Sequence, residues 1–174
     1  MEKKKKIFSK NPDLVYYTVL GAIVIGVLFF YSFVGFFPRV SGESMMNTLH
    51  DGDFMMCRRV RDASKFERFD IVIATMEDGT QIVKRIIGLP GEEVFIDENG
   101  NIYINGDILE ESYGRERIKD PGRAYQIVTL KENEFFLLGD NRNNSLDSRF
   151  EEIGNVSLNR IKGIVVKYKD HSKE

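Results

Sequence analysis

The sequence contains one cysteine and two histidines among 174 residues, and this scarcity excludes several kinds of chemistry. The single cysteine, Cys57, cannot form an intrachain disulfide, and its apolar surroundings in DFMMCRRV predict a small core residue. His50 and His171 are too far apart in the sequence to form a zinc-ligand cluster with it. We expect both histidines to be solvated surface residues, and we expect no metal and no cofactor.

The overall charge is also close to zero. A formal net charge of −2 gives no argument for a nucleic-acid partner, and we expect none. The charge is nevertheless uneven, because residues 1–10 carry five lysines against one glutamate, whereas residues 14–37 carry no charge at all. That uncharged run matches the ~20 residues that a helix needs to cross a bilayer. Tyr16 and Tyr17 lie at one end of it, where interfacial aromatic residues are common.

These features predict three parts: a basic cytoplasmic N-terminus (1–13), a transmembrane anchor (14–37) and an extracytoplasmic domain (38–174). The orientation follows from the lysines before the run and the single Arg39 after it, and predicts a single-pass protein of the cell membrane. The alternative is a cleavable signal peptide, whose apolar region is typically ~7–15 residues long. The longer run here, with no small-x-small cleavage site at its end, favours the retained anchor.

After residue 40 no segment sustains helical periodicity, and no repeat or low-complexity tract occurs. The pattern is instead one of short strands separated by turn dipeptides such as Asp78-Gly79, Pro90-Gly91 and Asn99-Gly100. It predicts an all-β domain of antiparallel strands, arranged as sheets or a partly closed barrel. The highly charged segment 110–123 is expected to be an excursion or a flexible loop. The predicted strands are 54–60, 70–75, 81–88, 93–96, 102–104, 125–130, 134–138 and 163–168.

The stretch QIVKRIIGLPG, residues 81–91, places Lys84 between Ile82 and Ile86 on one face of a predicted strand. Burial among isoleucines favours the neutral amine and lowers a lysine pKa by several units, which makes the amine a competent general base. The alternative is a lysine that extends from the sheet edge to water. The sequence alone leaves both interpretations open.

The stretch GDNRNNSLDSR, residues 139–149, concentrates opposite charges in one loop after an apolar strand. This density indicates a hydrogen-bonded network that fixes the loop. A calcium loop is disfavoured, because Arg142 stands at the third position, where an oxygen ligand is needed. Residues 143–145 fit a glycosylation pattern weakly, and an ordinary salt-bridged turn remains open. The charged residues are Asp140, Arg142, Asp147 and Arg149.

The stretch VSGESMMNTLHDGD, residues 40–53, contains two serines, Ser41 and Ser44, in a turn-prone segment. A serine hydroxyl is a poor nucleophile until a neighbouring base takes its proton. Taken alone, neither serine is a strong candidate. Ser44 becomes a stronger candidate only in combination with the predicted strand that carries Lys84 and the charged loop, which follow it in the chain.

SMMNTL, VKRIIGLPG and GDNRNNSLDSR, in this order behind one apolar run, resemble the three sequence boxes of the bacterial type I signal peptidases. FDIVIA (69–74) resembles the remaining strand box, so the resemblance spans nearly the whole chain. It implies a monomeric, membrane-bound serine protease that cleaves signal peptides from exported preproteins after small-x-small sites. It assigns Ser44 as nucleophile, Lys84 as general base and Ser145 as the hydroxyl that orients the lysine. The charged residues that hold the loop are Asp140, Arg142, Asp147 and Arg149.

The resemblance also implies the all-β fold that this family shares with the LexA-type repressors. Three positions depart from the family pattern: Asn47 replaces the usual proline, Gly42 replaces a serine that donates to the oxyanion in some members, and Phe69 replaces a glycine. The second oxyanion donor is therefore open, with Ser41 one position away. Two competing interpretations are a membrane-anchored module that only binds exported chains, and a LexA-type autoprotease. The second is disfavoured, because no DNA-binding domain precedes residue 40. The endoplasmic-type branch is also disfavoured, because it uses histidine where Lys84 stands.

Overall fold

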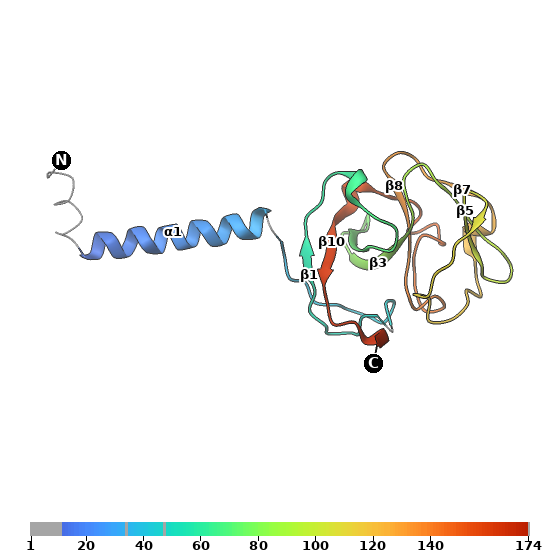
Figure 1. Cartoon of the computed structure of the whole chain (residues 1–174), viewed down its shortest axis with the longest axis horizontal. Coiled ribbons are helices and arrows are strands. Elements are labelled where there is room, and N and C mark those ends of the chain that lie inside the picture. The colour runs from blue at the N-terminus through green and yellow to red at the C-terminus, as the bar shows by residue number, and fades with distance from the viewer. Residues whose placement is uncertain (1–11, 34, 47, 174) are drawn as a thin grey trace. The chain divides into compact units, whose positions relative to one another are not determined.

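The computed structural model describes residues 12–33, 35–46 and 48–173, which form two units divided between Gly35 and Phe36. The first unit contains one helix, α1 (Pro12–Phe33), shown in Figure 1. Proline suits the first turn of a helix, and Asp13 there complements the helix dipole. Residues 12–30 form a stretch long and apolar enough to cross a membrane, and apolar side chains are exposed on all of its faces. The helix ends at Phe33, before the end of the predicted anchor.

The second unit is an all-β domain whose strands pair antiparallel, which confirms the predicted fold class. One sheet has the order β1-β10-β2-β3-β8-β9, and the other has the order β6-β5-β4-β7 (Figure 1). Neither sheet closes into a barrel within the described residues. The strands are β1 (Met56–Arg58), β2 (Ile71–Thr75), β3 (Gln81–Gly88), β4 (Glu93–Ile96), β5 (Ile102–Ile104), β6 (Asp107–Ile108), β7 (Val128–Thr129), β8 (Glu134–Leu138), β9 (Val156–Ser157) and β10 (Ile161–Lys167).

Short 3-10 helices connect some of these strands. They are η1 (Ala63–Lys65), η2 (Gly122–Tyr125), η3 (Leu158–Arg160) and η4 (His171–Lys173). The strands predicted over 54–60 and 125–130 are shorter than expected. Only residues 56–58 of the first form β1, and only residues 128–129 of the second form β7, since Tyr125 belongs to η2. The charged segment 110–123 is an excursion without a strand, but it is held at several points, one of which is the bond from the Arg115 backbone N–H to the Asp140 carbonyl oxygen. Ile118 is buried in the core, and Glu111 forms an ion pair with Arg142.

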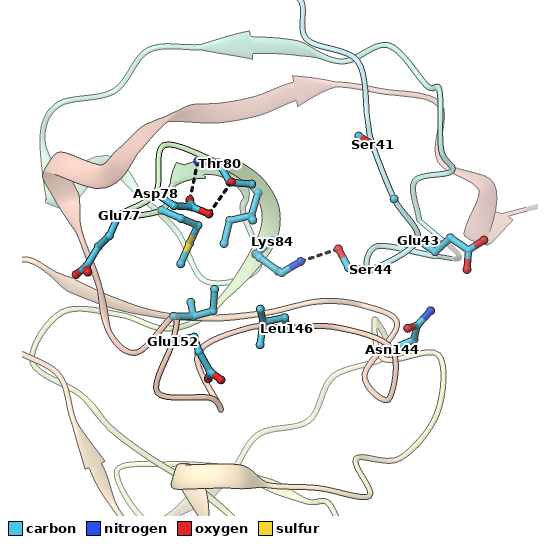
Figure 2. Close-up of a pocket in the computed structure, with 14 residues that line it drawn as sticks. Ser41, Glu43, Ser44, Glu77, Asp78, Thr80, Lys84, Asn144, Leu146 and Glu152 are labelled. Carbon is cyan, nitrogen blue, oxygen red and sulfur yellow. Dashed lines mark hydrogen bonds between the residues drawn. The ribbon is translucent and has the colours of Figure 1, made fainter.

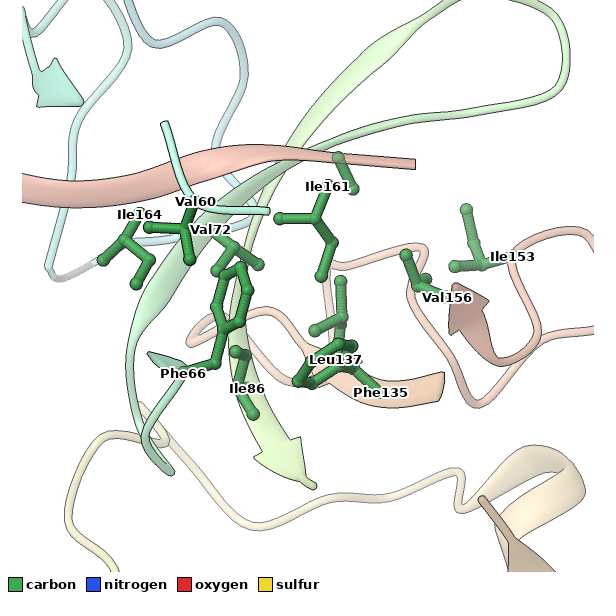
Figure 3. Packing of buried hydrophobic residues seen from close by; sticks show 11 residues of the cluster. Val60, Phe66, Val72, Ile86, Phe135, Leu137, Ile153, Val156, Ile161 and Ile164 are labelled. Carbon is green, nitrogen blue, oxygen red and sulfur yellow. The ribbon is translucent and has the colours of Figure 1, made fainter. Parts of the chain in front are cut away.

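The six-stranded sheet carries a separate apolar cluster on each face, as the alternation of strand side chains requires. Val72, Ile86 and Leu137 pack in the first cluster, seen in Figure 3. Ile71 and Ile73, the neighbours of Val72 in β2, pack in the second with Met45. That second cluster matters for function, because it seats the segment after Ser44 on the sheet. Met45 and Leu49 are buried within this cluster, and their burial fixes the position of the turn that carries Ser44.

The backbone of Phe69, at the entrance to β2, has φ of 76°. This is the left-handed region, which costs a residue with a side chain roughly 1–2 kcal/mol and costs glycine nothing. The departure from glycine at this position therefore has a structural meaning: the fold keeps the glycine conformation although phenylalanine stands there. The Phe69 ring packs 4.9 Å from the ring of Tyr113, and its backbone N–H donates to the Ile86 carbonyl oxygen.

Candidate active site

Three separate segments meet around Ser44. The first is the turn that carries this serine, the second is β3, and the third is the loop 139–149 that follows β8. Strands β3 and β8 are direct neighbours, with Arg85 opposite Leu138, so the loop begins beside the middle of β3. Asn141 then joins the loop to the turn. Its backbone N–H donates to the Ser44 carbonyl oxygen, and its side-chain amide donates to the Glu43 carbonyl oxygen, each at 3.0 Å.

The side chains of Ser44 and Lys84 are in direct contact. Lys84 Nζ and Ser44 Oγ lie 2.6 Å apart in a hydrogen bond, at the centre of Figure 2. Lys84 is only 3% exposed, so the alternative of a lysine that reaches water is wrong. Burial lowers the pKa of Lys84 from 10.5 to about 8, although the carboxylates of Asp147 and Asp140 partly oppose this shift. At this pKa about a tenth of the amine is neutral at pH 7, far more than for an ordinary lysine.

Asp140 anchors the start of the loop to β3. Its buried carboxylate accepts two hydrogen bonds from the Arg85 guanidinium, at 2.8 and 2.6 Å, and one from the Thr48 hydroxyl. The Arg85 guanidinium also lies 3.8 Å from the centre of the Tyr113 ring and donates to the Phe69 carbonyl oxygen. A buried pair with this many hydrogen bonds fixes geometry, because neither charge can be left unpaired.

Asp147 and Arg149 form a second buried pair within the loop. The Arg149 guanidinium donates to Asp147 at 2.8 and 2.9 Å and to the carbonyl oxygens of Asp120 and Arg142. The Asp147 oxygen that accepts at 2.9 Å, Oδ2, also accepts from the Gly139 backbone N–H. The predicted charged network therefore exists, but its members do not all pair with one another. Arg142 instead pairs with Glu111 at 2.8 Å, outside the loop.

Ser145 lies beside the turn that carries Ser44, but it does not form a hydrogen bond with Lys84. No described residue forms a hydrogen bond with its buried hydroxyl. The hydroxyl packs against Gly139, where an added Cβ would lie 2.2 Å from Ser145 Oγ and 2.5 Å from the Ser44 carbonyl oxygen. Glycine is thus required at position 139, where the loop passes close to the Ser44 carbonyl oxygen. The predicted role of Ser145 in orienting Lys84 is not tested by this arrangement.

A groove of about 630 Å³ opens over the Ser44–Lys84 pair. Figure 2 shows Lys84 and Ser44 in its interior, with Leu146 and Glu152 on one side and Thr80 on the other. Among described residues nothing accepts the Ser44 backbone N–H. Gly42, in contrast, donates its N–H to Asp51 at 2.8 Å and has φ of 93°, so a side chain there would be strained. Ser41 lines the groove.

The two histidines are not the solvated surface residues that we expected. Their rings stack 3.9 Å apart, and His171 Nε2 lies 2.9 Å from an Asp53 carboxylate oxygen that also accepts from the His50 backbone N–H. The two histidines join the C-terminal segment to the segment that follows Ser44, and neither histidine lines the groove. Cys57 is buried as predicted, and burial raises the pKa of its thiol to about 12. Asn47 lies outside the described residues. These residues contain no group of His, Cys, Asp or Glu side chains suited to a metal ion.

Three residues of the site were not identified from the sequence. Asn141 forms a hydrogen bond with the turn that carries Ser44. Arg85 forms an ion pair with Asp140, and the Thr48 hydroxyl donates to the same carboxylate. Arg85 carried a usable signal, because an arginine on an apolar strand needs a buried partner. Asn141 and Thr48 carried none, since their partners are distant in the sequence and set by the fold.

A serine hydroxyl held against a buried amine at the base of a groove is the arrangement of a serine endopeptidase. Residues 14–168 match the family model for "Signal peptidase, peptidase S26", and the chain belongs to this family. It is 36% identical to signal peptidase I S of Bacillus subtilis (strain 168) over 86% of this chain and 82% of the relative. It is 33% identical to signal peptidase I of Bacillus licheniformis over 92% of this chain and 87% of the relative.

A crystal structure of a signal peptidase I from Enterococcus faecalis V583 is also similar to this chain. The identity is 31%, the match covers 59% of this chain and 97% of that structure, and the TM-score is 0.47.

Proposed function

We propose that this protein removes N-terminal signal peptides from exported preproteins, with Ser44 as the nucleophile and Lys84 as the general base. The observation that carries the proposal is the 2.6 Å contact between Ser44 Oγ and Lys84 Nζ, at a buried lysine with a pKa of about 8. The matched family and the curated relatives supply the substrate class. Of the hydroxyl groups that line the groove, Ser44 is the one bonded to Lys84 among the described residues, and Cys57 does not line the groove.

The chemistry follows from these positions. Neutral Lys84 accepts the Ser44 proton as Oγ attacks the scissile carbonyl carbon, and an oxyanion forms. The Ser44 backbone N–H is the first donor to that oxygen. The Lys84 ammonium then protonates the leaving amine, and the C–N bond breaks to give an acyl-enzyme. Lys84, neutral again, takes a proton from water, which attacks the ester and releases the signal peptide with Ser44 reprotonated.

The supporting residues hold this pair in place. Asp140 and Asp147 fix the two ends of the loop, each through a buried arginine. Arg142 ties the same loop to Glu111. For Ser145 we propose a bond to Lys84 that forms only with substrate present, since catalytic hydrogen bonds often tighten only in the complex.

The substrate segment binds in extended form along the groove and pairs with an exposed stretch of enzyme backbone. Small residues at the −1 and −3 positions then face shallow pockets near Ser44, so cleavage follows an Ala-x-Ala type of site. Helix α1 anchors the enzyme in the bilayer where the apolar segment of the substrate also resides. The proposed order is a cytoplasmic segment (1–13), a membrane anchor (14–37) and an extracytoplasmic catalytic domain (38–174) of a monomeric protein.

The test is cleavage of a preprotein with an Ala-x-Ala site by the full chain in detergent or lipid. Ser44→Ala and Lys84→Ala should each lower the rate at least about a thousandfold. Ser41→Ala is the matched control, because it removes the other hydroxyl of the same turn, and it should retain most of the activity. An inactive wild type would favour a module that only binds exported chains. Activity lost in Ser41→Ala and kept in Ser44→Ala would move the nucleophile to Ser41.

A further inference from the structure

A second cavity, of about 340 Å³, lies outside the catalytic groove, between the end of β1 and the start of β10. Its charged lining consists of Arg59, Arg61 and Lys162, and none of its lining residues is acidic. Its apolar wall consists of Val60, Leu158 and Ile161. None of these six residues has a part in the proposed chemistry, so the cavity is separate from the site already described.

The close approach of two backbone segments builds this cavity. A Cβ at Gly163 would lie 2.3 Å from the Arg58 carbonyl oxygen, so glycine is needed for β1 and β10 to meet here. That approach brings Arg59 of one segment beside Lys162 of the other. Val60 and Ile161 belong to the apolar cluster beneath, visible in Figure 3, so the floor of the cavity is part of the core. The cations therefore stand on a fixed support.

The positive charges of the cavity are not balanced by carboxylates among its lining residues. None of its three cations forms an ion pair with a carboxylate in the part of the chain that the structure describes. The nearest carboxylate in sequence, Asp62, does not line the cavity, and its Oδ1 accepts from the Ser64 backbone N–H at 3.1 Å and from the Ser64 hydroxyl at 2.8 Å. Three like charges around one concave surface repel one another and favour an anionic ligand.

The Arg59 guanidinium lies 5.4 Å from the centre of the Phe36 ring. This contact holds the planar fork in one place, and a guanidinium fork matches the oxygens of a phosphate. Asn159 adds a side-chain amide to the same lining. Its Oδ1 accepts the Ser157 hydroxyl, which orients the amide and leaves its N–H groups as donors. The cavity thus presents three exposed cations and an amide donor above an apolar wall.

We propose that this cavity binds the phosphate of an anionic phospholipid headgroup. This inference rests on the proposed membrane anchor, because it needs the cavity to lie at headgroup depth. Phe36 follows the last residue of α1 by only three positions, and its backbone pairs with Cys57 in β1. The adjoining chain also exposes Phe37 (49%) and Phe54 (72%), which suit the interface between headgroups and acyl chains. The apolar wall then contacts the first methylenes of the lipid.

The experiment titrates the detergent-solubilised full chain with short-chain phosphatidylglycerol, phosphatidylcholine or inorganic phosphate and measures each Kd calorimetrically. Phosphatidylglycerol should bind at least about tenfold more tightly than phosphatidylcholine. The double variant Arg61→Gln/Lys162→Gln should weaken phosphatidylglycerol binding at least about tenfold. The matched control Lys119→Gln/Lys131→Gln removes two exposed lysines from other surfaces, and it should bind like the wild type.

Three results would overturn the proposal: equal affinity for the two lipids, wild-type affinity in the double variant, or inorganic phosphate binding as tightly as phosphatidylglycerol. The last would make the ligand a soluble phosphate compound. Preprotein cleavage in lipid-free detergent is measured on the same samples. The double variant should cleave within about twofold of the wild type, since neither residue lines the catalytic groove. Loss of cleavage in the wild type would contradict the catalytic proposal without affecting the lipid titration, so the two failures are distinguishable.

Discussion

The backbone N–H of Asn141 donates a 3.0 Å hydrogen bond to the carbonyl oxygen of Ser44. The side chain of Asn141 donates a second bond to the carbonyl oxygen of Glu43, across 98 positions of sequence. These two bonds hold the backbone on both sides of the Ser44 N–H, the proposed oxyanion donor. The loop after β8 therefore holds the backbone of Ser44, the proposed nucleophile.

Replacing Asn141 with alanine should lower kcat about five- to tenfold with little change in KM. The variant loses one hydrogen bond, worth roughly 1 kcal/mol, at the peptide group that carries the oxyanion donor. Steady-state cleavage of a preprotein measures the effect. Asn143→Ala is the matched control, because Asn143 bonds to Arg117 on the other side of the loop, and it should stay within about twofold. Equal losses in the two variants would contradict a positioning role for Asn141.

The sequence predicted the fold class, and the family resemblance selected Ser44 and Lys84, whose side chains are in contact, but neither indicated the ion-pair partners. Local alternation along residues 81–88 placed Lys84 among isoleucines but left both a buried and a water-exposed lysine open, and the structure buries it. The charge density of residues 139–149 indicated a network that fixes the loop but did not indicate which residues pair. Asp140 pairs with Arg85 and Arg142 pairs with Glu111, both outside the loop. Such partners depend on which strands are neighbours, and a single sequence does not show strand order. Asp147 and Arg149, two positions apart, pair within the loop.

The two histidines show the same limit, because a single sequence does not indicate contacts between distant residues. His50 and His171 are separated by most of the domain, and nothing near either one indicates their stacking. Phe69 shows a different limit of prediction from sequence. Comparison with the family pattern identified the position as unusual, but only the backbone angle of 76° explains why glycine is preferred there.

At Phe69 glycine should be more stabilising than alanine. In ordinary extended chain, glycine costs roughly 0.5–1 kcal/mol relative to alanine, but at a positive φ the preference reverses. We therefore expect Phe69→Gly to exceed Phe69→Ala in free energy of unfolding by about 1 kcal/mol. Urea titration followed by far-ultraviolet circular dichroism measures the difference. The same pair of changes at exposed Gln81, whose φ is not positive, should favour alanine. An alanine preference at both positions would mean that the Phe69 backbone is not strained.

Replacing Lys84 with methionine should stabilise the fold while abolishing cleavage. The folded-state pKa of Lys84 is lowered from 10.5 to about 8, and each unit corresponds to 1.36 kcal/mol, so burial of the charged amine costs about 3 kcal/mol. Between pH 8 and 10.5 the unfolded chain binds this proton more tightly than the folded protein does. The free energy of unfolding of the wild type therefore rises with pH across that window, and the full cost is present below pH 8.

Lys84→Met should accordingly raise the free energy of unfolding by about 1–3 kcal/mol at pH 7, less the lost bond to Ser44, and the gain should vanish near pH 10.5. Urea titrations at pH 7 and pH 10 measure both values. Lys119→Met, at an exposed lysine, should change them by no more than about 0.5 kcal/mol. A destabilised Lys84→Met protein would show that the buried ammonium is well compensated, contrary to its lowered pKa.

The pH dependence of kcat/KM for preprotein cleavage tests the central claim most directly, because this ratio reports the pKa of the free enzyme's essential base. If neutral Lys84 takes the proton of Ser44, kcat/KM should rise about tenfold per pH unit below a single apparent pKa of about 8 and level off above it. A rise centred near pH 6.5, the ordinary histidine value, or a rate that does not change between pH 6 and 9, would contradict Lys84 as the base.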